Sequence, residues 1–239
     1  MFPAPTDLPE TIPALLALRR ESDGDLAALV ADDGTVTYAD LDDASASLAA
    51  RLVEAGVGSG DRVGLLAPNG VEWAVVAYAV MRIGAVLVPL STLLRSPELV
   101  AQLATADVSH LVAAPDVRGR DHLAELEAVA PGIRAAGDAG ERHAALPSLR
   151  HAWHTDAIPD ASAPTALVRS LEDRVRPVDD MVVLFTSGST STPKGTIHTH
   201  GGALRATAAG LDARRVLHGE RLYIPMPFFW TGGFGAGLL

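Results

Sequence analysis

Residues 186–195 gather the chemical groups that bind phosphate. Six of these ten residues carry a hydroxyl, two are glycine, and Lys194 is the one lysine of the chain. Hydroxyls and backbone N–H groups donate hydrogen bonds to phosphate oxygens, glycine lets the backbone approach closely, and lysine supplies positive charge. A triphosphate needs this combination, so we expect a phosphate-binding loop here.

Two other interpretations of this segment are weaker. A flexible Ser/Thr linker has a similar composition, but such a linker is not usually held between two apolar strands, which we expect at residues 181–185 and 195–200. A Walker A loop places Gly-Lys-Ser/Thr at the start of a helix. Here the order is Pro193-Lys194-Gly195 and a β-type segment follows, which disfavours a P-loop kinase or ATPase.

Residues 185–195 resemble the AMP-binding signature of adenylate-forming enzymes, which include acyl- and aryl-CoA synthetases, luciferases and peptide-synthetase adenylation domains. Ser191 departs from the pattern, because many members have glycine there. The resemblance implies that the loop holds the β- and γ-phosphates of ATP, bridged by Mg²⁺. It implies Lys194 as the catalytic cation, and Thr186, Ser187, Gly188, Ser189, Thr190, Lys194 and Gly195 as the nucleotide-binding residues.

Other blocks of the chain resemble the same family in the same order. They are residues 37–41, 60–63, 67–69 and 84–90. After the loop, residues 225–233 are similar to the family's acyl-pocket segment, with Trp230 where many members have histidine. An aromatic side chain would form a wall for the tail of the acid, and glycine would leave room for it. The implied pocket residues are Phe229, Trp230, Gly232 and Gly233. A pocket role has less support for Phe228 than for Trp230, and the alternative for Phe228, Phe229 and Trp230 is a place in the core.

The family reaction implied by this resemblance has two steps. A small-molecule carboxylic acid attacks the α-phosphorus of ATP, which releases pyrophosphate and leaves an acyl-adenylate; a thiol then displaces AMP. The chain has no cysteine, so the sulfur would come from coenzyme A or a carrier thiol. Two alternatives stay open: a non-catalytic half-domain that keeps the phosphate loop, and a phosphotransferase that uses the same loop without releasing pyrophosphate.

The elements that must position this loop alternate between buried strands and helices. We expect strands at residues 62–67, 85–90, 110–114, 181–185, 195–200 and 221–226, and a hairpin around Asp33-Gly34. Helices are expected behind a Thr37/Asp40 capping box, from a cap at Asn69 to residue 83, and over residues 96–106 and 203–217. This order predicts an α/β fold with mostly parallel sheets flanked by helices.

Residues 116–180 break this order. Pro, Ala, Gly and Arg dominate there, so we expect an irregular connection with short strands at most and one helix at residues 121–129. By resemblance, residues 1–239 form a partial N-terminal AMP-binding domain that lacks the C-terminal remainder and the small C-terminal domain. We therefore expect a fragment whose own activity is doubtful.

Composition excludes several other classes. A net charge of −10 gives no support to nucleic-acid binding. The most apolar stretch, residues 73–90, is broken by Arg82, Gly84 and Pro89, so we expect no membrane span and a cytoplasmic protein. His151 and His154 are expected at the surface, and His198 and His200 are expected to be structural. Neither pair has further ligand candidates nearby, so we expect no metal site.

Overall fold

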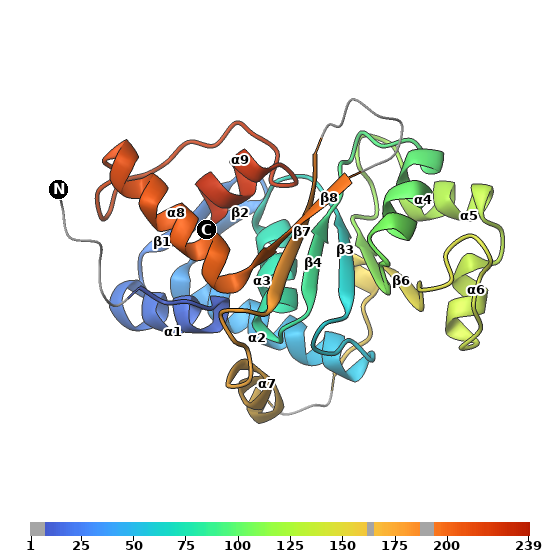
Figure 1. Cartoon of the computed structure of the whole chain (residues 1–239), viewed down its shortest axis with the longest axis horizontal. Coiled ribbons are helices and arrows are strands. Elements are labelled where there is room, and N and C mark those ends of the chain that lie inside the picture. The colour runs from blue at the N-terminus through green and yellow to red at the C-terminus, as the bar shows by residue number, and fades with distance from the viewer. Residues whose placement is uncertain (1–7, 162–164, 187–193) are drawn as a thin grey trace.

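A six-stranded sheet forms the centre of the molecule (Figure 1). The computed structural model describes residues 8–161, 165–186 and 194–239. In the sheet, the strands follow the order β6-β5-β3-β4-β7-β8. The first five are parallel, and β8 is antiparallel to β7. Their bounds are β3 Arg62–Leu66, β4 Val86–Pro89, β5 His110–Ala113, β6 His151–His154, β7 Asp180–Thr186 and β8 Lys194–Thr199.

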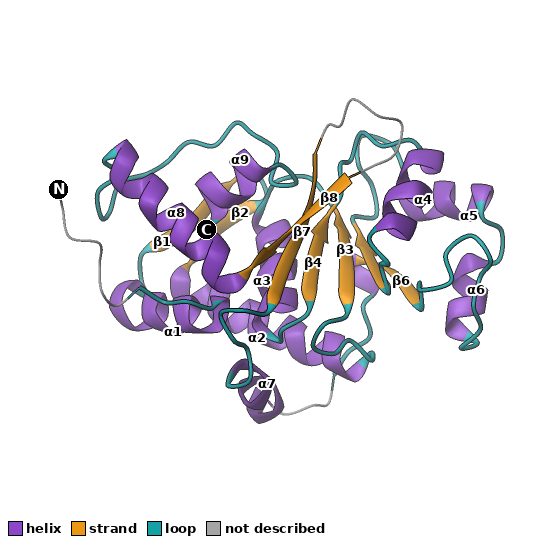
Figure 2. Cartoon of the chain, in the orientation of Figure 1, coloured by secondary structure: helices purple, strands orange, loops and turns teal. Residues whose placement is uncertain are grey.

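Helices cover both faces of this sheet (Figure 2). On one face, α1 (Ile12–Asp23), α2 (Tyr38–Glu54) and α3 (Val71–Arg82) bury a cluster that includes Leu52, Trp73 and Leu87. On the other, α4 (Ser96–Thr105) and α5 (His122–Val129) bury a second cluster around Val88 and Leu111. β4 and β5 are buried at every position, as expected for parallel strands with helices on both faces. The predicted α/β fold is confirmed.

Helix α3 is buried nearly all round, as its sequence predicts. It carries one buried cation, Arg82, whose side chain reaches α2 and α7 (Thr165–Glu172). The guanidinium donates to the carboxylates of Asp42 at 2.8 Å and Glu172 at 2.5 Å, and to the Ser45 hydroxyl at 2.7 Å. A buried charge requires this degree of pairing, so Arg82 joins three helices through one side chain.

The hairpin and the following helix agree with the sequence in most details. β1 (Ala27–Ala31) and β2 (Gly34–Thr37) are antiparallel, and the Thr37/Asp40 capping box at the start of α2 is present. The buried face of α2 differs from its apolar pattern at one position, because Ala44 is exposed and Ser45 is buried. The Ser45 hydroxyl can be buried because it donates to the Asp42 carbonyl and accepts from Arg82.

The predicted cap of α3 is wrong. Its N-cap position is Gly70, and the orphan N–H groups of Val71 and Glu72 donate to the Asp33 carboxylate at 3.0 and 3.2 Å. Asp33 lies in the turn of the β1–β2 hairpin, so a residue 38 positions away caps the helix. A Cβ on Gly70 would lie 2.4 Å from an Asp33 carboxylate oxygen, which explains the glycine. Asn69 makes other contacts, described below.

Residues 116–180 contain more structure than we expected. The expected helix is α5, but α6 (Ile133–Asp138) and α7 are also helical, and β6 extends the sheet beyond β5. Trp153 of β6 stacks on His110 of β5 with ring centroids 5.6 Å apart. A four-residue edge strand is too short to show a period in sequence, and α7 packs against α2 through contacts that pattern alone does not reveal.

The last part of the described chain differs from its predicted strand. Helix α8 is His200–Arg214, and α9 (Thr231–Gly233) runs into a π-helical turn, Phe234–Leu238. Residues 221–226 form no strand, and within the described residues the sheet ends at β8. Without a strand partner this segment is left largely exposed, with Tyr223 86% accessible.

Candidate functional site at the carboxyl ends of the strands

Both described ends of the predicted phosphate loop lie at one edge of the sheet. β7 is parallel to β4 and ends at Thr186, and β8 begins at Lys194, which pairs directly with Thr186. This is the edge at which the parallel strands β3, β4 and β5 end. Ligands of open α/β sheets bind outside the carboxyl ends of the strands, so the segment starts and finishes where a ligand is expected.

Thr186, Lys194 and Gly195 are exposed at this edge. The predicted residues Ser187, Gly188, Ser189 and Thr190, together with Ser191, lie outside the described residues. Gly195 has a packing role in addition to the one expected of it, because a Cβ there would come within 2.7 Å of the Val183 side chain. The glycine thus allows β8 to lie close over β7.

An apolar cavity of about 390 Å³ lies beside β7 and β8. Val182 and Leu184 of β7 form one wall, and Ala203, Ala206 and Gly210 of α8 form another. The cavity is also lined by His198, Thr207, Arg214, Thr231, Gly232, Phe234, Gly235 and Leu239. Its size and apolar walls suit the hydrocarbon part of a small molecule.

A second cavity, of about 330 Å³, lies in the loops that follow the parallel strands. Phe229 contributes an aromatic wall, and Asp116 and Arg118 contribute charge. The remaining lining residues are Ala67, Pro68, Asn69, Thr92, Leu93, Val117, Pro225 and Pro227. Residues 225–235 therefore supply part of the wall of both cavities.

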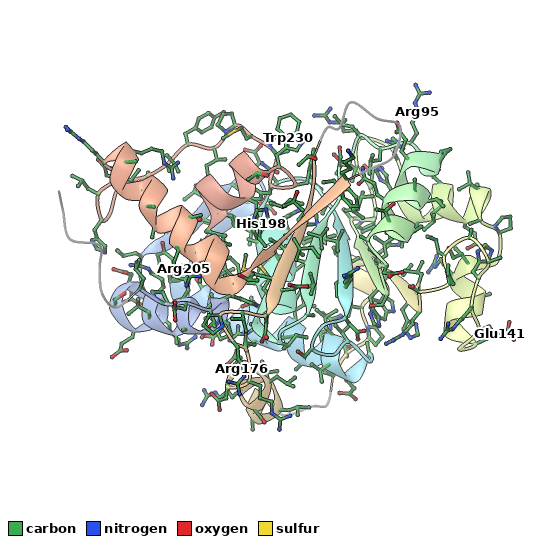
Figure 3. All side chains as sticks on the ribbon, viewed as in Figure 1. Arg95, Glu141, Arg176, His198, Arg205 and Trp230 are labelled. Carbon is green, nitrogen blue, oxygen red and sulfur yellow. The ribbon has the colours of Figure 1, made fainter. Side chains whose placement is uncertain are left out.

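The four predicted pocket residues have different surroundings. Phe229 lines the second cavity and Gly232 the apolar one. Trp230 is 53% accessible and lies near the top of Figure 3. His198, which lines the apolar cavity, lies lower in the same view, between α8 and the sheet. Gly233 is buried in a tight turn, where a Cβ would lie 2.0 Å from the Pro227 carbonyl oxygen.

Phe228 belongs to the core, which was the alternative to a pocket role for this residue. Its ring meets Trp73 edge-on with centroids 5.2 Å apart, and Phe234 meets the same Trp73 at 6.2 Å. Trp73 thus contacts the residues on both sides of the turn at 229–233, which carries the predicted pocket residues.

The histidines of this region have separate environments. His198 lies in β8, but His200 is the first residue of α8 and is fully buried. Its Nδ1 accepts a hydrogen bond from the Ile12 N–H at 3.3 Å. Burial lowers the pKa of His200 to about 4, so the ring is neutral. Among the described residues, no three His, Asp or Glu side chains gather as a metal site.

The sequence did not point to Asn69, His198 or Phe234 as parts of this region. Asn69 lies in the resembling block at residues 67–69, directly after β3, and that position was a usable signal. His198 and Phe234 line the apolar cavity because α8 folds back across β7 and β8, which no local pattern specifies.

Comparison with known proteins identifies the family to which this fold belongs. A family model described as AMP-binding enzyme matches residues 17–239. The chain belongs to this family. A methyl-dioxo-octahydroindenyl propanoyl:CoA ligase of Mycobacterium tuberculosis is 32% identical over 96% of this chain and 44% of its own length. A feruloyl-CoA synthase of Amycolatopsis is 34% identical over 87% of this chain and 38% of its own.

Solved structures agree on the fold. A long-chain-fatty-acid-CoA ligase of Archaeoglobus fulgidus superposes with a TM-score of 0.74 at 18% identity, covering 98% of this chain and 46% of that chain. The N-terminal domain of a Mycobacterium tuberculosis protein, FACL13, gives 0.67 at 25% identity over 94% of this chain and 53% of that domain. The AMP-binding chain described here thus spans less than half the length of the curated relatives it matches.

None of the helices in the described part of the chain has both the length and the hydrophobicity that crossing a membrane requires.

Proposed function

We propose that this chain is the N-terminal part of an ATP-dependent acid–thiol ligase and supplies its phosphate loop and part of its acid pocket. The observation that carries the proposal is the pairing of Thr186 with Lys194 at the edge where β3, β4 and β5 end. Two cavities that share residues 225–235 as a wall add room for an acid. Membership of the AMP-binding family and the CoA-ligase relatives support the same reaction.

In the first step, a carboxylate oxygen of the acid forms a bond to the α-phosphorus of ATP. The bond from that phosphorus to the bridging oxygen of the β-phosphate breaks, and pyrophosphate leaves. Negative charge grows on the leaving group, so a fixed ammonium such as that of Lys194 would stabilise the transition state more than the ground state. The exposed hydroxyl of Thr186 would donate to a phosphate oxygen.

Mg²⁺ would add charge neutralisation between the phosphates. It usually binds through substrate phosphates, water and one or two carboxylates, which fits a described region that holds no cluster of acidic ligands. In the second step, the sulfur of coenzyme A or of a carrier thiol attacks the acyl carbon, and AMP leaves with the electron pair of the acyl–oxygen bond.

The test is acid-dependent exchange of labelled pyrophosphate into ATP by the full-length gene product. Lys194→Ala should lower the exchange rate by about 100-fold, as loss of a transition-state charge does. The matched control is Arg205→Ala, which removes another exposed cation; Arg205 lies in α8 and pairs with Glu10, which precedes α1. This variant should exchange like wild type.

Two results would contradict the proposal. Unchanged exchange in Lys194→Ala would remove the role given to that residue. Transfer of the γ-phosphate to an acceptor without release of pyrophosphate would favour the phosphotransferase alternative instead.

A further inference from the structure

Asn69 holds two backbone groups that lie far away in the sequence. Its carboxamide nitrogen donates to the Met226 carbonyl at 2.9 Å, and its carboxamide oxygen accepts from the Phe228 N–H at 2.7 Å. The backbone N–H of Phe228 must be a donor, so it fixes which side of the amide carries the oxygen. The Asn69 side chain therefore pairs with a backbone carbonyl and a backbone N–H of residues 226–228, as the backbone of a neighbouring strand would.

This contact explains why Asn69 is not the cap of α3. Asp33 already accepts from the first N–H groups of that helix, which leaves both ends of the carboxamide for residues 226–228. Asn69 follows β3 directly at the carboxyl edge of the sheet, so the bonds tie residues 226–228 to this edge.

The same segment has few other attachments. Phe228 is buried against Trp73, but residues 221–223 before it are exposed. The turn after it closes on itself, because the Trp230 N–H donates to Pro227 and the Phe234 N–H donates to Trp230. The position of this turn therefore depends on what holds residues 226–228, and the Asn69 side chain forms hydrogen bonds with Met226 and Phe228.

We propose that Asn69 is a positioning residue for the acid pocket, an inference that rests on the function proposed above. By holding Met226 and Phe228, Asn69 fixes the position of Phe229 in the wall of the second cavity, the one in the loops that follow the parallel strands. Asn69 lines the same cavity. The rigid turn then carries Gly232 to the apolar cavity. A shift of residues 226–228 would change both cavities together.

The chemistry of the side chain makes asparagine specific for this task. A primary amide offers one acceptor and donors in a fixed plane. Aspartate has nearly the same shape but would face the Met226 carbonyl with a second acceptor, so it can keep the bond to Phe228 and lose the one to Met226. Alanine loses both and leaves the buried Phe228 N–H without a partner, which costs more than a missing contact.

The first experiment follows amide hydrogen exchange in the ¹⁵N-labelled chain itself. Asn69→Ala should speed exchange of the Phe228 amide by at least about tenfold, the factor for roughly 1.4 kcal/mol, and Asn69→Asp should have a smaller effect. The matched control is Asp33→Ala, which removes two carboxylate-to-backbone bonds at the next residues along the chain. It should speed amide exchange at the start of α3, at Val71 and Glu72, and change the exchange of the Phe228 amide much less than Asn69→Ala does.

The second experiment measures kinetics of pyrophosphate exchange in the full-length gene product. Asn69→Ala should raise KM for the acid by about tenfold, with KM for ATP unchanged, and Asp33→Ala should change neither. Partial recovery of the acid KM in Asn69→Asp supports the role of the Phe228 bond.

These outcomes separate the inference from the function on which it rests. Unaltered Phe228 exchange in Asn69→Ala overturns the inference, as does faster exchange with an unchanged KM for the acid. If wild type shows no pyrophosphate exchange, the proposed function fails, and the amide measurement still decides whether Asn69 holds residues 226–228.

Discussion

Buried neutral histidines are the clearest residue-scale finding outside the candidate site. His200 in α8 and His110 in β5 are both fully buried, and the ring Nε2 of each has no hydrogen-bond partner among the described residues. Burial lowers the pKa of both to about 4, from an ordinary value of 6.5. The sequence predicted a structural role for His200, and its contact with Ile12 shows what that role is: it joins the start of α1 to the start of α8.

The pKa of His200 predicts how stability depends on pH. The unfolded chain binds a proton at this ring below about pH 6.5, whereas the folded chain excludes it until about pH 4, so folding loses stability as pH falls between these values. The loss approaches about 1.4 kcal/mol per pH unit for each such histidine. Urea unfolding of wild type and His200→Gln between pH 7 and 5 should show a shallower decline in the variant; parallel curves would contradict this assignment.

At the scale of elements, Arg82 decides how α2, α3 and α7 meet. It is 4% accessible, and its partners Asp42 and Glu172 belong to the other two helices. Removing Arg82 would take the buried cation from Glu172 and Asp42, which is more harmful than breaking an exposed pair. Arg20, which also pairs with Asp42 but is largely exposed, offers the comparison within the same network.

Arg82→Leu should lower the free energy of unfolding by about 3–5 kcal/mol. Arg20→Ala should lower it by about 1 kcal/mol at most, because water and salt screen an exposed pair. Urea titration at neutral pH measures both. Equal losses in the two variants would mean that Arg82 does not bind the helices together.

The elements that sequence predicts well are those whose own residues determine them. β3, β4, β5 and β7 are apolar runs, and the capping box at Thr37 is a local motif, so both could be predicted. β6, α7 and the cap of α3 depend on partners elsewhere in the chain. Residues 221–226 show the reverse error, since their composition suits a strand but no neighbouring strand is available to them in the described chain.

The candidate site divides in the same way. The phosphate loop stays a prediction; it could be proposed from sequence because hydroxyls, glycines and Lys194 are adjacent there. The cavities could not, because their walls combine β7, α8 and residues 225–235, which only folding brings together. Asn69 was expected to cap a helix, but its bonding partners lie 157 and 159 residues away.

At the scale of the whole molecule, the last helices close back on the first. α1 and the segments next to it meet α8 and the following loop through Ile12 with His200, Glu10 with Arg205, and Asp23 with His218. These pairs are separated by 188 to 195 residues. Helix α1 therefore holds α8 in place, on the side of the molecule away from α4, α5 and α6 (Figure 1).

Removing residues 1–25 should thus loosen α8 before the rest of the sheet. Limited trypsin digestion with mass spectrometry should show faster cleavage after Arg205 and Arg214, both exposed in α8. Cleavage after Arg142, in the loop between α6 and β6, is the internal control and should keep its rate. If all three sites become equally sensitive, the deletion unfolds the whole chain and the local role of α1 is wrong.

The capping of α3 by Asp33 has a practical consequence for anyone who engineers this protein. The turn between β1 and β2 is short, charged and exposed, the features by which sites for affinity tags and inserted peptides are usually chosen. Its carboxylate nevertheless completes the first turn of a helix in the core of the molecule. An insertion there would separate the cap from its helix, so the hairpin tip is a poor site for a graft despite its accessibility.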